Sequence, residues 1–233
     1  QSKARWDSGV YRVALVGYTN AGKSTLLNRL TGSDVYAKDE LFATLDPTTR
    51  ALELEEGRRI TITDTVGFIQ KLPTTLVESF KSTLAEVRAA DLVLLVVDVS
   101  DPHRELEISA VRSVLEEIGA HEIRRVEVLN KSDLVDEAEL REATAMHPDA
   151  QVVSALDGGG VRGLLYRIAH EASLGSVSLT VLVPYGKGLL MKMVHERCQV
   201  MRESYVQEGL LATVRADARM AATLEPYVVE ESS

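Results

Sequence analysis

The sequence contains one cysteine, Cys198, so no disulfide can form within the chain, and a reducing compartment, the cytoplasm, is expected. Long apolar runs are absent too. The longest, Leu92–Val97, is six residues long, whereas about 20 are needed to span a bilayer. A run of this length is typical of a strand buried on both faces of a parallel sheet. We therefore expect a globular protein without a membrane span.

The sequence also has fewer positively than negatively charged residues. The 26 lysines and arginines are outnumbered by 35 aspartates and glutamates, which gives a net charge of −9. The overall field therefore opposes indiscriminate attraction to nucleic acid, and DNA is not expected as a partner. Because the net charge is negative, binding to RNA would need a local positively charged surface whose shape fits the RNA. Arg50, Arg58, Arg59 and Lys71 could form one, although exposed charges are more often simply solvated.

Short apolar runs alternate with helical periodicity along residues 10–173, a pattern typical of βα units on a mostly parallel sheet. The pattern predicts an α/β fold. A turn at Glu56–Arg58 joins the second and third strands into an antiparallel hairpin. Helices are expected after Pro73 and from Asp101 to Gly119. The predicted strands are Val10–Val16, Ala51–Glu55, Ile60–Asp64, Leu92–Asp98, Val126–Asn130 and Gln151–Ser154.

The pattern changes after residue 176, where apolar and polar residues begin to alternate. One strand, one helix and two further strands are expected, at 177–183, 189–201, 205–207 and 211–215. The sequence thus predicts two domains: residues 10–174, and a small α+β domain at 177–233.

A phosphate-binding loop follows the first predicted strand. Its pattern, GxxxxGKS/T, uses glycines so that backbone N–H groups can turn toward phosphates, and the next helix directs its positive end at them. Lys23 supplies a positive charge, and Ser24 is a ligand for Mg²⁺. The loop residues are Gly17, Tyr18, Thr19, Asn20, Ala21, Gly22, Lys23 and Ser24.

A second motif, DxxG, comprises Asp64, Thr65, Val66 and Gly67. By itself this motif is weak, because an aspartate before a glycine often only caps a turn. Here it ends a strand about 40 residues after the phosphate loop, at the sheet edge where such folds bind ligands. We expect Asp64 to reach Mg²⁺ through water and the Gly67 N–H to contact a γ-phosphate.

A third motif, NKxD, distinguishes guanine from adenine. The Asp133 carboxylate can accept hydrogen bonds from the ring N–H and exocyclic amine that only guanine has. An unpaired carboxylate would disfavour adenine by up to about 10⁴-fold, so GTP is expected and an ATPase or nucleotide kinase is disfavoured. Lys131 is expected over the base, and backbone N–H groups of a following loop at guanine O6. The residues of the motif and of that loop are Asn130, Lys131, Ser132, Asp133, Ser154, Ala155 and Leu156.

The loop Leu41–Arg50 is rich in threonine. One of its threonines is expected to bind Mg²⁺ when GTP is present, which would order the loop as a switch. Spacing alone does not choose among Thr44, Thr48 and Thr49.

In this order, the segments GYTNAGKSTL, FATLDPTTR, TDTVGFIQKLP and NKSD resemble the HflX-type GTPases, ribosome-associated members of the Obg-HflX-like group. The resemblance covers nearly the whole chain. It implies a P-loop NTPase with a Ras-like G domain, followed by a small C-terminal domain. It also implies GTP hydrolysis linked to binding the large ribosomal subunit and separating stalled or idle ribosomes. Family members usually carry an N-terminal domain and a helical linker, so residues 1–9 are expected to be the end of that linker.

The resemblance assigns the switch role to Thr44. Lys23, Thr44 and Gly67 are then the expected catalytic residues, and Ser24, Thr44 and Asp64 the expected Mg²⁺ ligands. Further nucleotide contacts are expected from Thr25, Phe42, Ala43, Leu45 and Asp46.

Phe68 follows Gly67, where Ras-like enzymes have a glutamine that orients the attacking water. Phenylalanine cannot hydrogen-bond to water, so hydrolysis is expected to be slow unless a partner, here the ribosome, assists. The alternative is a binding module that senses GTP or GDP and for which turnover is incidental. Asn20 occupies a position where some cation-dependent relatives have an asparagine that helps to hold K⁺. The other interpretation is that Asn20 bridges the phosphate loop to a switch.

Overall fold

The computed structural model describes residues 10–32, 47–55, 57–67 and 84–229. The internal contacts of the chain define two compact units. The larger contains Arg12–Leu52 and Thr61–Ile168, and the smaller contains Gln1–Tyr11, Glu53–Ile60 and Ala169–Ser233.

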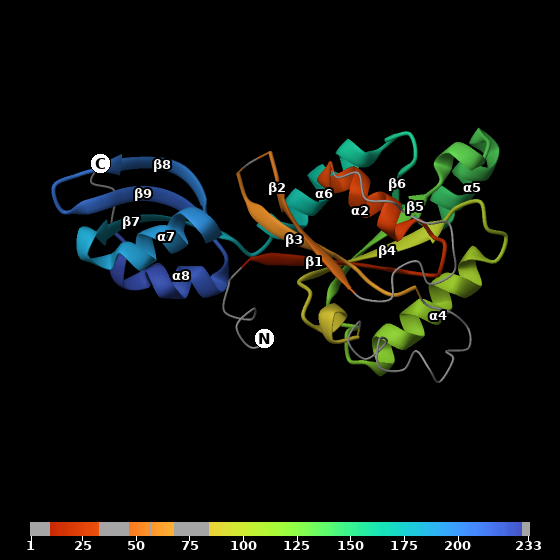
Figure 1. The fold of residues 1–233 in the computed structure, drawn as a ribbon, viewed down its shortest axis with the longest axis horizontal. Helices are drawn as coiled ribbons and strands as arrows, with labels where there is room; N and C mark the ends of the chain where they lie inside the picture. The colour runs from red at the N-terminus through yellow and green to blue at the C-terminus, as the bar shows by residue number, and fades with distance from the viewer. Residues whose placement is uncertain (1–9, 33–46, 56, 68–83, 230–233) are drawn as a thin grey trace. The chain divides into compact units, whose positions relative to one another are not determined.

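The larger unit is built on a six-stranded sheet in the order β2-β3-β1-β4-β5-β6 (Figure 1). The elements of this part of the chain are β1 (Tyr11–Gly17), α2 (Lys23–Thr31), β2 (Thr48–Glu53), β3 (Arg59–Asp64), β4 (Leu92–Asp98), α4 (Arg104–Glu117), β5 (Arg124–Asn130), α5 (Glu137–Met146), β6 (Gln151–Val152) and α6 (Val161–Ser173).

Parallel pairing dominates this sheet. β1 pairs with β4, β4 with β5 and β5 with β6, all parallel. Only residues 54–58 connect β2 to its neighbour β3, which is too short for a parallel crossover, so this pair is antiparallel. The predicted α/β architecture with a mostly parallel sheet is confirmed.

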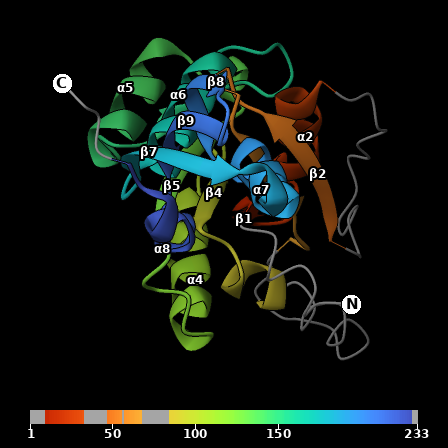
Figure 2. The same cartoon turned by 90° about the vertical axis from the view of Figure 1, so that its left-hand side faces the viewer.

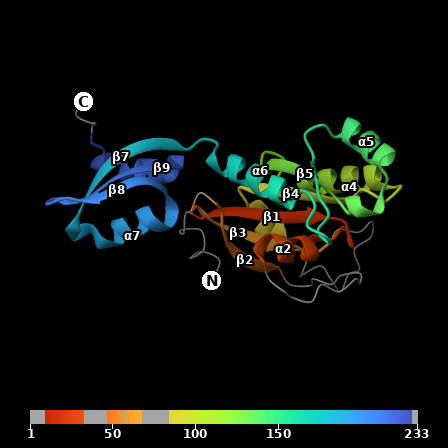
Figure 3. The same cartoon turned by 90° about the horizontal axis from the view of Figure 1, so that it is seen from above.

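Helices pack on both faces of the sheet. Ala14 and Val16 of β1 belong to one buried cluster with Ile108 of α4 and Ala143 of α5. Because side chains alternate along a strand, the buried Leu15 faces the opposite layer. Figure 3 shows α2 and α4 on opposite sides of β1.

Several predicted boundaries shift in the structure. β2 ends at Glu53, before the predicted Glu55, because the turn begins at Leu54, whose N–H donates to Arg58 O at 2.9 Å. α4 starts at Arg104 rather than near Asp101, because the Asp101 carboxylate accepts the His103 N–H at 2.7 Å in the turn before the helix. Most of the helix predicted after Pro73 lies outside the described residues; residues 84–88 are helical.

The smaller unit contains a three-stranded antiparallel sheet in the order β7-β9-β8 (Figure 2). One face of the sheet packs on two helices, through Val194 of the first and Met220 and Leu224 of the second. The elements are β7 (Val177–Pro184), α7 (Gly188–Arg197), β8 (Gln199–Tyr205), β9 (Gly209–Ala216) and α8 (Ala218–Leu224).

Three predictions for this unit need correction. The strand predicted at 205–207 is β8, which covers Gln199–Tyr205 and ends at a turn, where the Gly209 N–H donates to Val206 O at 3.3 Å. The helix predicted to reach Met201 ends at Arg197, because the buried Cys198 has an extended backbone and Met201 lies on β8. The sequence interpretation also missed α8, which begins where the Asp217 carboxylate accepts the Met220 N–H at 2.7 Å. Among the described helices, none combines the length and apolar character that a membrane crossing requires.

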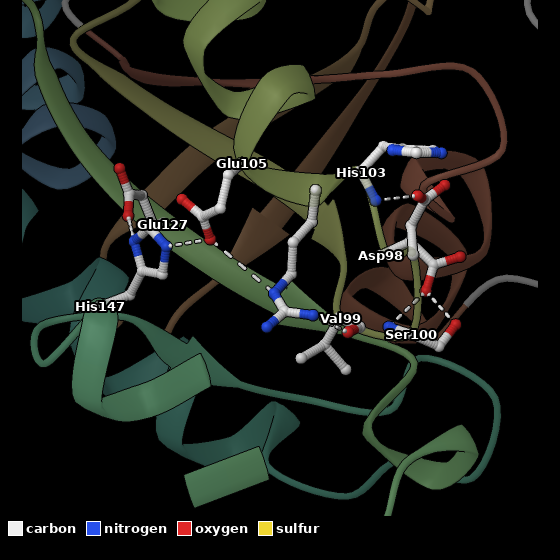
Figure 4. Close-up of polar contacts among 9 residues, drawn as sticks. Asp98, Val99, Ser100, His103, Glu105, Glu127 and His147 are labelled. Atoms are coloured by element: carbon white, nitrogen blue, oxygen red, sulfur yellow. Dashed lines mark hydrogen bonds and ion pairs between the residues drawn. The ribbon is translucent and has the colours of Figure 1, made fainter. Parts of the chain in front are cut away.

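His147 ties the middle of β5 to α4 (Figure 4). Its Nδ1 lies 2.8 Å from a Glu127 carboxylate oxygen and its Nε2 lies 2.9 Å from a Glu105 oxygen. Arg112 of α4 also pairs with Glu127. Partial burial raises the pKa of Glu127, but Arg112 and His147 outweigh it, so the pKa lies below its ordinary value. The ionised carboxylate therefore stabilises the folded state.

We predict that Glu127→Gln lowers the free energy of unfolding by about 2 kcal/mol at pH 7, because a hydrogen-bonded charged group is lost. A lowered folded-state pKa gives stability above the unfolded-state value of 4.5 that disappears as pH falls through the folded-state value. Urea unfolding at pH 7 and in the acid range should show the two proteins converging at low pH. Glu137→Gln, at an exposed carboxylate, is the control, and parallel pH curves for wild type and Glu127→Gln would contradict the prediction.

Candidate functional site

The sequence motifs meet at one edge of the sheet. Because β1, β4, β5 and β6 run parallel, their carboxyl ends lie together, with Gly17 in register with Val96 and Asp98 with Asn130. Val153 N–H donates to Leu129 O at 2.9 Å and brings the following loop to the same edge. Such an edge is where open α/β sheets bind ligands.

The two glycines of the phosphate loop allow close approaches that a side chain would prevent. A Cβ atom on Gly17 would lie 2.2 Å from the Val96 carbonyl oxygen. Gly22 has a left-handed backbone with φ of 91°, and a Cβ there would lie 2.3 Å from Asn130 Nδ2. The loop therefore lies close to the end of β4 at Gly17 and close to the end of β5 at Gly22, and α2 begins at the next residue.

Lys23 is buried at the start of α2. Its ammonium donates to the carbonyl oxygens of Gly17 at 3.1 Å and Tyr18 at 2.8 Å. Burial lowers the pKa of Lys23 to about 8, against the opposing effect of the Asp64 and Glu107 carboxylates. The loop thus holds a desolvated cation that an anionic ligand would stabilise.

Acidic residues lie close to both lysines of the site, Lys23 and Lys131. Asp98, at the end of β4, pairs with Lys131 Nζ at 2.7 Å. The Asp98 carboxylate also accepts the N–H and the hydroxyl of Ser100 (Figure 4). Burial, with Asp101 and Asp98, raises the pKa of Glu107 to about 7, although Lys131 and Lys23 act in the opposite direction. The site therefore balances two lysines against nearby carboxylates.

Ser24 and Asp64 lie where Mg²⁺ ligands were predicted. The Ser24 hydroxyl donates to the Asp64 carboxylate at 2.6 Å, and Asp64 is buried. Hydroxyl and carboxylate oxygens are the hard ligands that Mg²⁺ prefers. The two side chains therefore fit a magnesium site.

The DxxG segment lies directly against the phosphate loop. A Cβ atom on Gly67 would be 2.8 Å from Thr19 Cα, so only glycine allows this approach. The Thr65 hydroxyl donates to Leu15 O at 2.6 Å, and both Thr65 and Val66 are buried. Their side chains fix the segment to β1, while Gly67 presents backbone to the loop.

Asn130 joins the phosphate loop to the loop Ser154–Leu156, the predicted guanine loop. Its side-chain amide donates to Ala21 O at 2.8 Å, and its Oδ1 accepts the Ala155 N–H at 3.0 Å. Ser132 N–H donates to Val153 O at 3.2 Å, which ties the two base-side loops together. Asp133 and Leu156 are exposed and lie free of the core.

Several predicted site residues lie outside the described residues. They include Thr44, the predicted switch threonine, and Phe68, which directly follows the DxxG motif. Asn20 is described: it is exposed and has a left-handed backbone with φ of 62°. The others outside the described part are Phe42, Ala43, Leu45 and Asp46.

Sequence reasoning missed three residues that the structure places at the site. Asp98 carried a signal, because it ends the most apolar run at the sheet edge shared by the motifs. Glu107 and Arg29 lie inside helices and carried none. Arg29 Nε donates to Ala155 O at 3.0 Å, and its Nη2 donates to Leu156 O.

Comparison with known proteins agrees with this geometry. Residues 12–131 match the family described as 50S ribosome-binding GTPase. The sequence is 41% identical to the GTPase HflX of Caldanaerobacter subterraneus over 98% of this chain and 52% of that protein. It is 46% identical to the GTPase HflX of Gluconacetobacter diazotrophicus over 88% of this chain and 46% of that protein. The chain thus spans about half the length of these relatives.

A solved structure shows the same fold. A GTP-binding protein from Sulfolobus solfataricus, in complex with GDP, has a TM-score of 0.56 and 27% identity, covering 74% of this chain and 54% of that chain. The predicted P-loop NTPase fold of the Ras-like class and the resemblance to HflX-type GTPases are confirmed. The chain belongs to the family of 50S ribosome-binding GTPases.

Proposed function

We propose that this chain binds GTP and GDP, hydrolyses GTP, and associates with the large ribosomal subunit according to the nucleotide it holds. The observation that carries the proposal is the Asn130 bridge, because one buried side chain bonds both the phosphate loop and the guanine loop. We also propose residues 10–174 as the G domain and 177–233 as a separate C-terminal domain. Ribosome separation is not proposed for this chain.

Guanine selection is assigned to the exposed Asp133 carboxylate and the loop at Ser154–Leu156. The carboxylate accepts the two N–H donors of guanine, and a backbone N–H donates to O6. Lys131 is held by Asp98 at 2.7 Å, which leaves its alkyl stem to pack over the base.

Phosphate binding is assigned to the loop from Gly17 to Ser24, with Lys23 as the point charge. Ser24, Asp64 and Thr44 would hold Mg²⁺, which when bound neutralises phosphate charge as it develops during transfer. Gly67 approaches the loop closely enough for its N–H to report a third phosphate. Loss of that phosphate would remove this contact with Gly67.

Turnover without a partner is expected to be slow, because Phe68 cannot orient water. A partner that supplies charge or positioning can add about 10³–10⁵ to the rate of phosphoryl transfer. The large subunit is the proposed partner, since the matched family is described by ribosome binding. For Asn20, K⁺ coordination and a bridge to a switch both remain proposals, which GTPase rates in K⁺ and Na⁺ distinguish.

Base preference tests the assignment of Asp133. We predict that Asp133→Asn weakens GDP binding by about 100-fold, because a charged acceptor with two oxygens is replaced by a neutral amide with one acceptor oxygen and an NH₂ donor that would face a donor of the base. ATP competition should become more effective relative to GTP. Asp149→Asn, at another exposed aspartate, is the matched control, and an unchanged base preference would contradict the assignment.

Proton uptake tests the role of Lys23. Bound phosphate should return the lowered pKa of Lys23 toward 10.5, so GDP binding near pH 8 should take up about half a proton. Calorimetry in buffers of different ionisation enthalpy measures this uptake. Glu107→Gln removes the other group that titrates nearby and, because the Glu107 carboxylate raises the pKa of Lys23, should leave the uptake at pH 8 at least as large. Zero uptake at pH 8 in that variant would contradict the role of Lys23.

Large ribosomal subunits test the proposed partner. We predict that they raise multiple-turnover GTP hydrolysis at least about tenfold, and that the chain pellets with them more strongly with a non-hydrolysable GTP analogue than with GDP. Lys23→Ala supplies the inactive baseline. Nucleotide-dependent pelleting without stimulation of hydrolysis would instead indicate a binding module that senses GTP or GDP. If the subunits neither stimulate hydrolysis nor pellet with the chain in a nucleotide-dependent way, the ribosomal role is refuted.

A further inference from the structure

The guanidinium of Arg29 holds two consecutive carbonyl groups of the predicted guanine loop. Arg29 lies in the last turn of α2, the helix that begins at the phosphate loop. Its Nε donates to Ala155 O at 3.0 Å, and its Nη2 donates to Leu156 O. The planar, forked shape of the guanidinium suits two neighbouring acceptors, which a lysine ammonium does not match.

The other groups of this loop are directed inward. Ser154 N–H donates to Gly159 O at 2.9 Å, and Ala155 N–H donates to Asn130 Oδ1 at 3.0 Å. Asp157 N–H donates to the Ser154 hydroxyl at 3.2 Å. These three N–H groups serve the protein itself, which makes the N–H of Leu156 the candidate donor to a bound base.

Arg29 controls the direction of that N–H through a single peptide plane. The Ala155 carbonyl and the Leu156 N–H belong to the same peptide unit, and no cis peptide occurs in the described residues. In a trans peptide the C=O and N–H bonds point in opposite directions. Because Arg29 binds the Ala155 carbonyl, the Leu156 N–H must point away from α2. Leu156 is 71% exposed, so no packing of its side chain fixes the plane instead.

We propose that Arg29 is a positioning residue for guanine recognition, which orients the Leu156 N–H toward O6 of the base. This inference rests on the proposed GTP and GDP binding. Arg29 does not touch the nucleotide in this account; it acts by keeping the loop in its binding conformation before the ligand arrives, which reduces the ordering cost of binding. Arg29 also links α2 to the guanine loop.

The competing explanation is that Arg29 only stabilises the fold, as a basic residue in the last turn of a helix does. The two explanations differ in which nucleotides are affected. A positioning role concerns O6, so it matters for guanine and hypoxanthine bases, which have O6, and not for 2-aminopurine, which lacks it. A purely structural role would weaken all three.

The experiment measures the affinities of GDP, IDP and 2-aminopurine riboside diphosphate for the full chain. We expect Arg29→Met to weaken GDP and IDP by about tenfold, the equivalent of one hydrogen bond, and 2-aminopurine riboside diphosphate by less than about twofold. Arg29→Lys keeps the charge with a single donor group and should recover only part of the loss. Arg141→Met, at an exposed arginine on α5, is the matched control.

The outcomes separate this inference from the proposed function. Equal weakening of all three nucleotides by Arg29→Met, or no weakening of any, overturns the positioning role while leaving GDP binding intact. A wild-type chain that binds none of the three refutes the proposed function itself. Thermal unfolding of each variant shows whether a loss arises from the fold, and the exposed location of Arg29 makes Arg29→Met compatible with folding.

Discussion

The buried side-chain amide of Asn130 joins segments that are far apart in the chain. It donates to Ala21 O in the phosphate loop and accepts from Ala155 N–H in the guanine loop, so both ends of the amide are paired. Leaving either end unpaired in the interior would cost about 1–3 kcal/mol. The need for glycine at Gly22 follows from the same contact, because a Cβ there would strike the amide. The distance between the two halves of the site is thereby set before any ligand binds.

Charge at the site runs against the charge of the whole chain. The protein carries a net charge of −9, yet Lys23 is buried where phosphates would bind and Lys131 is held at the base side. Burial of Lys23 disfavours its charged form in the free protein. A phosphate removes that penalty, so the site favours anions by local structure rather than by the overall field.

The sheet and the motifs were predictable because each motif directly follows a strand with a clear apolar pattern. The errors arose where local pattern and tertiary contact disagree. Helical spacing continues past Arg197, but the extended, buried Cys198 ends the helix and Met201 joins a strand. The short helix α8 depends on burying Met220 and Leu224 against the sheet, a contact that seven residues of sequence do not reveal. The roles of Thr44 remain predictions.

The motifs and their order could be recognised in the sequence, because loops proposed to bind phosphate, metal and guanine need particular residue types at fixed local spacing. The tertiary structure alone decided how those parts are held. The contact of Arg29 with Ala155 spans 126 residues and that of Asn130 with Ala21 spans 109. No local periodicity encodes such contacts, since they exist only after parallel strands have brought their carboxyl ends to one edge.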